Sequence, residues 1–180
     1  DGKTIAAGTN NSIILWDVNS GQMTKKLSSS VGAYEFAFSP DGKVIASSVS
    51  ESTILLWEVS SGKLIHTLTG HLGSATSLVF SPNGKVLASG SHYDGKVILW
   101  DVNSGKLIHT INVYEKENTD PSTTVFYVLY SLTFNSNGKI LAAIKGSDVL
   151  LWDTLTGEQI GQPFIDRTGK TSALTFISDR

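Results

Sequence analysis

Three side chains in one short segment, His71, Ser89 and Asp94, are of the types that make a nucleophilic catalytic triad. In such a triad a histidine takes the proton of an exposed serine, an aspartate orients the histidine, and backbone N–H groups form an oxyanion hole. Ser89 instead ends an apolar run, Val86-Leu87-Ala88-Ser89, that has the pattern of a strand, and no strained nucleophile turn precedes it. We therefore expect these residues to be structural, and we expect no catalytic residue in the chain.

Other reactive side chains are few. His66 and His109 occur in the same Leu-Ile-His-Thr context, one repeat apart, so we expect both to be solvated and to share no metal ion. The sequence has no Walker glycine loop, no zincin motif and no persuasive pair of carboxylates. It also has no cysteine, which excludes disulfides and thiolate chemistry. These observations predict a protein that is not an enzyme, with no metal and no cofactor.

The unit that positions these residues runs from Phe80 to Trp100, FSPNGKVLASGSHYDGKVILW. In Ser81-Pro82-Asn83-Gly84 the proline fixes φ and the glycine supplies a positive φ, so the chain turns before the next apolar run. Further turns at Tyr93-Asp94-Gly95 and Asn103-Ser104-Gly105 separate the runs that follow. With Ala75 to Phe80 leading in, the pattern predicts four antiparallel strands of roughly five or six residues each and no helix.

Copies of this unit follow one another along the chain. The turn before the second strand recurs, in steps of 40, 42, 54 and 42 residues, at Asp1-Gly2-Lys3, Asp41-Gly42-Lys43, Asn83-Gly84-Lys85, Asn137-Gly138-Lys139 and, in part, Asp179. The third strand of each copy ends in a tryptophan and an acidic residue, at Trp16-Asp17, Trp57-Glu58, Trp100-Asp101 and Trp152-Asp153. A period of about 40 to 45 residues with four strands and this dipeptide is typical of β-propeller blades.

On these residues the chain resembles the WD40 family, over essentially its whole length. The resemblance implies an all-β fold, a β-propeller of four-stranded antiparallel blades, with about four blades' worth in this chain. The blade units would fall at about 1–39, 40–81, 82–135 and 136–180, in a permuted phase, within one WD40-like segment over 1–180. The resemblance also implies a non-enzymatic scaffold or sensor module for protein–protein interaction, such as a domain attached to a signalling protein.

The family is known for a structural hydrogen-bond set that links a Gly-His dipeptide, a serine or threonine, an aspartate and the tryptophan of a blade. The residues that match this set are His71, Ser89, Asp94 and Trp100. The other copies have different residues, with Asn10, Glu51 and Gly146 at the aspartate position and Ser29, Val125 and Arg167 at the histidine position. We therefore expect the full set only in the third copy.

An alternative class comes from the Ser-Pro-Asp-Gly-Lys turn, which also occurs in propellers related to TolB and to prolyl oligopeptidases. That resemblance covers the turn alone and lacks the four tryptophan steps. An enzyme or a small-ligand-binding propeller is therefore the alternative function. Titratable groups that converge in a pocket would favour it, whereas an exposed apolar patch beside residues 112–124 would favour the scaffold.

Composition limits the partners. The chain has 180 residues, 40% of them hydrophobic, and a net charge of −2. Its basic residues are spread singly along the turns, which argues against a nucleic-acid surface. No apolar run approaches the roughly 20 residues that a membrane helix needs, and no signal peptide precedes the first strand. We expect a cytoplasmic protein that binds neither nucleic acid nor membrane.

The largest departure from the period is an insertion between the third and fourth copies. Gly105 and Phe134 are 29 residues apart, whereas Gly62 and Phe80 are 18 apart, so the insertion falls within residues 112–124. Insertions in repeat arrays lie in loops, where binding is common, and in the family this loop shares a face with the turn between the second and third strands. A solvated loop without a partner is an equal alternative. The expected contacts with a protein partner are Tyr114, Glu115, Lys116, Glu117, His92 and Tyr93.

Three arrangements could complete the ring. The last predicted strand, Thr171 to Phe176, could pair with the first unit of the same chain and give four blades. Two chains could exchange these strands and form a homodimer with an eight-bladed ring. The segment could instead belong to a longer protein that supplies further blades, and the cut through the turn at Asp1 favours this arrangement.

Overall fold

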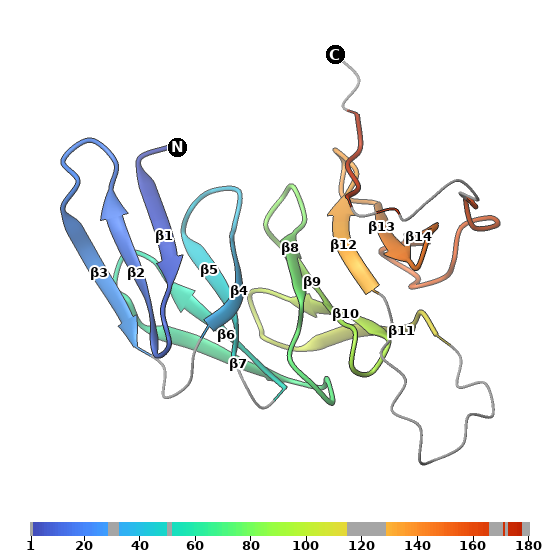
Figure 1. Ribbon diagram of the computed structural model, residues 1–180, viewed down its shortest axis with the longest axis horizontal. Helices are drawn as coiled ribbons and strands as arrows, with labels where there is room; N and C mark the ends of the chain where they lie inside the picture. Colours follow the sequence, from blue (N-terminus) through green and yellow to red (C-terminus); the bar gives the residue numbers. More distant parts are fainter. Residues whose placement is uncertain are drawn as a thin grey trace.

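The computed structural model describes residues 2–28, 33–49, 52–114, 129–165, 171 and 173–177. Every regular element within these ranges is a β-strand, and neighbouring strands pair antiparallel. The strands form four sheets that follow one another across the molecule, from the sheet of β1, β2 and β3 at one side to the sheet of β12, β13 and β14 at the other (Figure 1). The predicted all-β fold of small antiparallel sheets is confirmed.

Each sheet is a meander in which strands adjacent in sequence are adjacent in space. The first sheet contains β1 (Thr4–Gly8), β2 (Ser12–Asp17) and β3 (Met23–Ser28). The second contains β4 (Ala33–Phe38), β5 (Val44–Val49), β6 (Thr53–Glu58) and β7 (Leu64–Thr69). The third contains β8 (Ser77–Phe80), β9 (Val86–Ser91), β10 (Lys96–Asp101) and β11 (Leu107–Asn112). The fourth contains β12 (Leu129–Phe134), β13 (Ile140–Lys145) and β14 (Asp148–Asp153).

Hydrophobic side chains fill the spaces between consecutive sheets. On β10, Val97 and Leu99 pack in the cluster shared with the fourth sheet, whereas Ile98 and Trp100 pack in the cluster shared with the second. This alternation is the two-residue period of a strand. Because both faces of such a strand are covered, its sequence reads as a continuous apolar run. Contacts between neighbouring sheets run through their first described strands, β1, β4, β8 and β12.

Two side chains fix the turn before β9. Ser81 Oγ donates a 2.8 Å hydrogen bond to Asn83 Oδ1 and accepts one of 3.0 Å from the Val86 amide. Gly84 has a φ of +69°, in the left-handed region that strains residues with a side chain. The pattern Ser-Pro-Asn-Gly is therefore a hydrogen-bonded reversal of the chain.

The acidic residue after the tryptophan holds the following turn. Asp101 Oδ1 accepts hydrogen bonds from the Ser104 hydroxyl at 2.6 Å and the Ser104 amide at 2.8 Å, and these bonds lower the pKa of the Asp101 carboxyl. Asp17 accepts the same pair of bonds from Ser20 in the first sheet. In the Trp-Asp dipeptide, the tryptophan thus packs in the core, and the aspartate beside it accepts the hydrogen bonds that stabilise the following turn.

The last predicted strand is wrong for the residues that the structure describes. Residues 171 and 173–177 contain no strand, and among described residues none pairs with the outer edge of β1. A strand needs a neighbour for its N–H and C=O groups, and this stretch lies away from β1 in Figure 1. In the fourth sheet, the described residues after β14 form isolated bridges, from Phe164 to Val149 and from Gln159 to Trp152.

Candidate functional site

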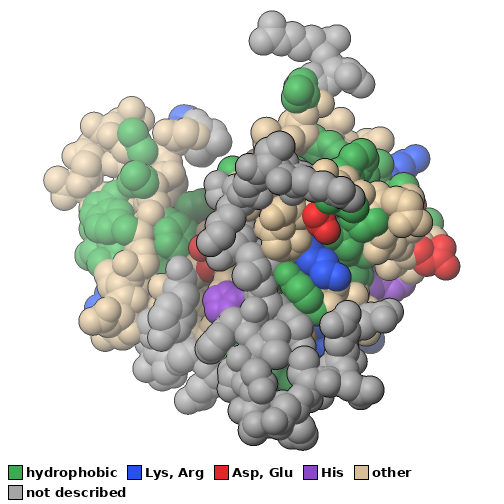
Figure 2. Space-filling view, turned by 45° about the vertical axis from the view of Figure 1, so that its right-hand side comes forward, with side chains coloured by type: hydrophobic (Ala, Val, Ile, Leu, Met, Phe, Trp, Pro, Cys, Tyr) green, Lys and Arg blue, Asp and Glu red, His purple; other side chains and the backbone are tan. Residues whose placement is uncertain are grey.

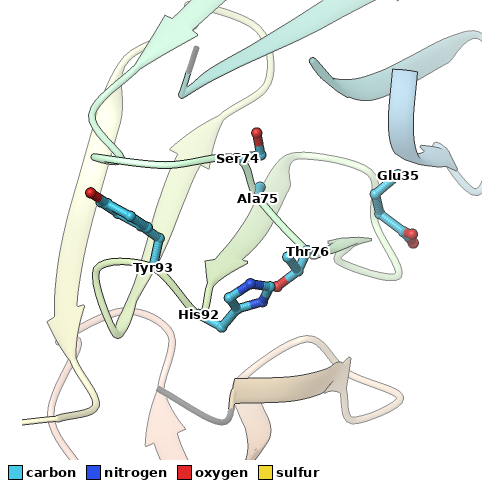
Figure 3. A pocket seen from close by; sticks show the side chains of 6 residues that line it. All are labelled: Glu35, Ser74, Ala75, Thr76, His92 and Tyr93. Carbon is cyan, nitrogen blue, oxygen red and sulfur yellow. The ribbon is translucent and has the colours of Figure 1, made fainter. Parts of the chain in front are cut away.

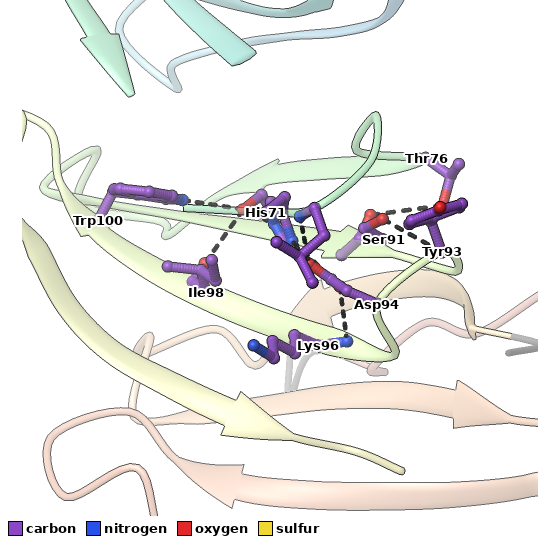
Figure 4. A network of polar contacts seen from close by, with 11 residues as sticks. His71, Thr76, Ser91, Tyr93, Asp94, Lys96, Ile98 and Trp100 are labelled. Atoms are coloured by element: carbon purple, nitrogen blue, oxygen red, sulfur yellow. Dashed lines mark hydrogen bonds and ion pairs between the residues drawn. The ribbon is translucent and has the colours of Figure 1, made fainter. Parts of the chain in front are cut away.

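Four buried side chains form one hydrogen-bonded network in the third sheet (Figure 4). Trp100 Nε1 donates to Ser89 Oγ at 2.8 Å, and His71 Nε2 lies 2.8 Å from the same oxygen. His71 Nδ1 lies 3.0 Å from Asp94 Oδ2. With its proton on Nδ1, His71 donates to Asp94 and accepts from the Ser89 hydroxyl, so each donor has an acceptor. The structure thus brings together all four residues of the expected set.

Strand pairing and two loops position these residues. Ser89 of β9 lies opposite Ile98 of β10, and Trp100 is two residues further along β10 on the same face. His71 comes from the loop between β7 and β8, and Asp94 from the β9–β10 turn. The side chains of His71 and Asp94 are each only 1% exposed.

The network has the order of a Ser-His-Asp triad without its access to substrate. Ser89 is fully buried, at 0% exposure, and its oxygen accepts the indole N–H of Trp100. Nucleophilic catalysis requires a serine oxygen that a substrate carbonyl can approach. The Ser89 oxygen is not accessible for such an attack, and its hydrogen bonds join strands β9 and β10 to the loop that carries His71.

Asp94 fastens the β9–β10 turn to the loop before β8. Besides His71, its carboxylate accepts hydrogen bonds from the Leu72 amide at 2.9 Å and the Lys96 amide at 3.0 Å. Burial raises the pKa of the Asp94 carboxyl, but the hydrogen bonds from His71 and Leu72 outweigh burial, and the net effect lowers that pKa. Asp94 is therefore an anion at neutral pH that holds both segments in place.

The second sheet has half of this network. Trp57 Nε1 donates to Ser47 Oγ at 3.2 Å, in the arrangement of Trp100 and Ser89. This bond was not predicted from the sequence, although Ser47 ends a Val-Ile-Ala-Ser run that matches the run ending at Ser89. The first and fourth sheets have alanine at the corresponding strand position, and alanine has no hydroxyl to accept the indole N–H.

Tyr93 and His92 lie on the turn that Asp94 holds. Tyr93 is 54% exposed, and its side chain packs so closely on Gly73 that a Cβ added to Gly73 would come within 2.5 Å of Tyr93. His92 is half-buried beside it. The glycine contact and the network beneath the turn together place a fixed aromatic ring at the surface.

A pocket of about 420 Å³ opens beside this turn, between the second and third sheets (Figure 3). Its lining residues are Glu35 from β4, Ser74, Ala75 and Thr76 from the loop before β8, and His92 and Tyr93 from the β9–β10 turn. Burial raises the pKa of the Glu35 carboxyl. Glu35 was not among the expected site residues, because only the packing of two sheets brings it to the turn.

The inserted segment begins next to the same turn. The amides of Val113 and Tyr114 donate to the Gly95 carbonyl oxygen at 3.0 and 3.4 Å. Lys145 Nζ lies 4.8 Å from the centroid of the Tyr114 ring, within the range of a cation–π contact. The structure therefore places Tyr114 near the turn that carries His92 and Tyr93. The remaining candidates, Glu115, Lys116 and Glu117, lie outside the described residues.

His66 and His109 are both partly exposed, each contacts the neighbouring sheet, and the two rings do not meet. His66 Nε2 lies 2.9 Å from the carbonyl oxygen of Asn103, and His109 Nε2 lies 2.7 Å from that of Leu155. Each acceptor belongs to a turn of the next sheet. Both rings are half-buried because they span the space between two sheets.

A second hollow, of about 810 Å³, opens at the other end of the strands, beside His66, Lys85 and Asp101. Among the residues that the structure describes, no group of three or more His, Asp or Glu side chains could hold a metal ion. The described ranges also include no helix long and apolar enough to cross a bilayer.

Four successive antiparallel sheets, packed face to face around shared cores, define an all-β repeat protein built from blade-like units. Residues 21–58 and 62–101 match the family model described as WD domain, G-beta repeat. These two segments are therefore WD40 repeats, in agreement with the resemblance inferred from the tryptophan steps. The second matched segment contains the whole network of His71, Ser89, Asp94 and Trp100. A search of curated proteins found no match.

Proposed function

We propose that this chain is a non-enzymatic scaffold that binds a protein or peptide partner beside the β9–β10 turn. The binding face would consist of this turn, the loop before β8 and the start of the inserted segment. WD40 repeats are in general protein-interaction scaffolds, which supports the class of function. The geometry of the third sheet supports this position of the site on the chain.

The observation that carries the proposal is the way Asp94 holds Tyr93. A buried carboxylate fixes the two segments of the face through hydrogen bonds to His71, Leu72 and Lys96, while Tyr93 remains 54% exposed on top of them. A pre-ordered aromatic side chain loses little conformational entropy when a partner covers it, and such residues are frequent anchors of interfaces. The remaining proposed contacts are His92, Tyr114, Glu115, Lys116 and Glu117.

A small-ligand-binding protein is the second candidate, and the pocket beside Glu35 favours it. Its volume of about 420 Å³ is within the range of about 300–1,000 Å³ that is common for small-molecule sites. One titratable group with a raised pKa, Glu35, lines it. A small ligand would depend on the pocket alone, whereas a protein partner would also depend on Tyr114, outside the pocket.

We propose in addition that another sheet covers the first one. Ile5 of β1 is 58% exposed, whereas the residues at the same strand position in the other sheets, Ile45, Leu87 and Leu141, are fully buried. The covering sheet would come from a second copy or from further blades of a longer protein. Analytical ultracentrifugation tests the first source, because a dimer supports the second copy and a monomer excludes it.

Selection of a phage-displayed library of random peptides on the chain tests the proposed face. We expect the selected peptides to lose binding to the double variant His92→Ala/Tyr93→Ala. They should still bind the control variant Leu155→Ala, because Leu155, which is 84% exposed, lies in the turn after β14, away from the proposed face. Binding that depends on Leu155 instead, or on neither site, would contradict the proposal. Loss of peptide binding in Tyr114→Ala would separate the scaffold from the small-ligand candidate.

A further inference from the structure

Glu35 occupies an unusual place for a carboxylate, because it faces a neighbouring sheet. On β4, Phe36 and Phe38 pack toward the first sheet and Ala37 packs toward the third. Successive side chains of a strand point to opposite faces, so Glu35 is on the face of Ala37, toward the third sheet. The register of β4 on β5 shifts between Ala33 and Glu35, and such bulges commonly redirect a side chain.

The residue at the corresponding place in the third sheet is Ser77, and it is bonded to its neighbour. In the strand register, Glu35 of β4 lies opposite Ser48 of β5, and Ser77 of β8 lies opposite Gly90 of β9, so Glu35 and Ser77 occupy equivalent positions in the two sheets. Ser77 Oγ accepts a 3.2 Å hydrogen bond from the Leu132 amide of the next sheet. Within the described ranges no donor bonds to the Glu35 carboxylate, and burial is the cause that raises its pKa. A half-buried carboxylate without a donor is energetically costly.

The other walls of the pocket are suited to a cation. Ser74 Oγ donates to the Val49 carbonyl and Thr76 Oγ1 to the Gly90 carbonyl, at 3.4 and 3.3 Å, so both oxygens keep lone pairs that can accept. The Tyr93 ring, fixed over Gly73, adds an aromatic surface that attracts cations. None of the described lining residues is lysine or arginine, and Glu35 is the one carboxylate among them (Figure 3).

We propose that this pocket receives a lysine or arginine side chain of the partner, with its ammonium or guanidinium group bonded to the Glu35 carboxylate. The proposal rests on the proposed binding face and names the chemistry of one contact on it. An anion would meet the Glu35 carboxylate as a like charge, and an aliphatic side chain would leave the carboxylate and two hydroxyl oxygens without donors. A basic side chain supplies the donor and the opposite charge that the Glu35 carboxylate lacks, and its remaining N–H groups can donate to a pocket hydroxyl.

Titration of the chain with N-acetyl-arginine amide and N-acetyl-lysine amide, followed by amide chemical shifts, tests the proposal. We expect saturable shifts at Thr76, His92 and Tyr93 with millimolar affinity, because one side chain supplies few contacts. N-acetyl-norleucine amide, which has a similar length and no charge, should bind at least about tenfold more weakly, since a charge-assisted hydrogen bond is lost. N-acetyl-glutamate amide should bind no better than norleucine.

Glu35→Gln should weaken binding of the basic amides by at least about tenfold, while Glu158→Gln, which alters an exposed carboxylate of the fourth sheet, should leave it unchanged. Glu35→Ser introduces the residue that β8 has at the corresponding place and should weaken binding equally. Equal affinity of these variants and wild type, or tighter binding of the norleucine or glutamate amide, would overturn the proposal. If the selected peptides still required Tyr93 in that case, the binding face would stand and only the basic contact would fall.

Discussion

The imidazole Nε2 of His66 lies 2.9 Å from the carbonyl oxygen of Asn103, so the last strand of the second sheet is hydrogen-bonded to a turn of the third. Gly105 of that turn approaches the same ring so closely that an added Cβ would come within 2.7 Å of it. His109 and Gly157 repeat this contact between the third and fourth sheets, where the corresponding distance is 3.1 Å. Neighbouring sheets are therefore joined by a hydrogen bond from a histidine of one sheet to a turn of the next, with a glycine of that turn packed on the histidine ring.

We expect Gly105→Ala to lower the free energy of unfolding more than Gly21→Ala does. Both glycines have a positive φ, +69° and +66°, so both alanines strain the backbone. An added Cβ meets the His66 ring only at Gly105, because nothing lies within 4 Å of the position at Gly21. Overpacking of this kind costs about 1–3 kcal/mol beyond the shared strain. Urea unfolding of the two variants measures the difference.

A double-variant cycle serves as the control for this contact. In a His66→Ala background, Gly105→Ala should cost no more than Gly21→Ala, because the ring is gone. Equal costs of the two glycine substitutions in the wild-type background would show that His66 does not pack on the turn.

Ser89→Ala should destabilise the chain more than Ser47→Ala. Ser89 Oγ is bonded to both Trp100 and His71 at 2.8 Å, so its removal leaves two buried polar groups without a partner, at about 1–3 kcal/mol each. Ser47 Oγ has one indole partner, at 3.2 Å. Chemical denaturation of both variants compares them, and an equal or smaller loss for Ser89→Ala would mean that the network is not formed in solution.

Asp94 should make the fold sensitive to acid. Its folded-state pKa is lowered, so its stabilising contribution is fully present above the unfolded pKa of about 3.9 and is lost as the pH falls through the lower folded value. Asp94→Asn should therefore be destabilising at pH 7 and become less so below about pH 4. Thermal melts of both proteins between neutral pH and about pH 3 give the comparison, and a difference independent of pH would contradict it.

Glu35 should have the opposite effect on stability. Burial raises its folded-state pKa, so the cost of its charge is fully present above that pKa and disappears below the unfolded value of about 4.3. We expect Glu35→Gln to stabilise the fold at pH 7, by under about 1 kcal/mol because solvent still screens the group, and to have no effect near pH 4. A destabilised Glu35→Gln at neutral pH would show that the carboxylate has a donor in the free chain.

Local sequence predicted the features that depend on neighbouring residues. The turn at Ser81 to Gly84 is encoded by its own proline, asparagine and glycine, and the apolar run ending at Trp100 follows from burial of both faces of one strand. The network around His71 came from a resemblance to a family with a known motif, since no spacing rule alone joins a loop histidine to an aspartate in a later turn.

Features made by two sheets were harder to predict. Glu35 is one charged residue in an ordinary strand pattern, and it becomes part of a pocket only because β4 packs beside β8. The contact of His66 with Asn103 likewise depends on how closely two sheets approach. Thr171 to Phe176 has the residue pattern of a first strand, yet pattern alone supplies no neighbouring edge for its backbone to pair with.

Hydrogen–deuterium exchange of the chain, with and without a peptide selected from the random library, tests the central claim most directly. We expect the amides in residues 71–76 and 91–95 to exchange more slowly on binding, because these residues form the loop before β8 and the β9–β10 turn. The amides in residues 84–85 and 101–103, which line the hollow at the other end of the strands, should show no change. Protection confined to residues 84–85 and 101–103 would contradict the account, because the partner would then bind the opposite end of the sheets.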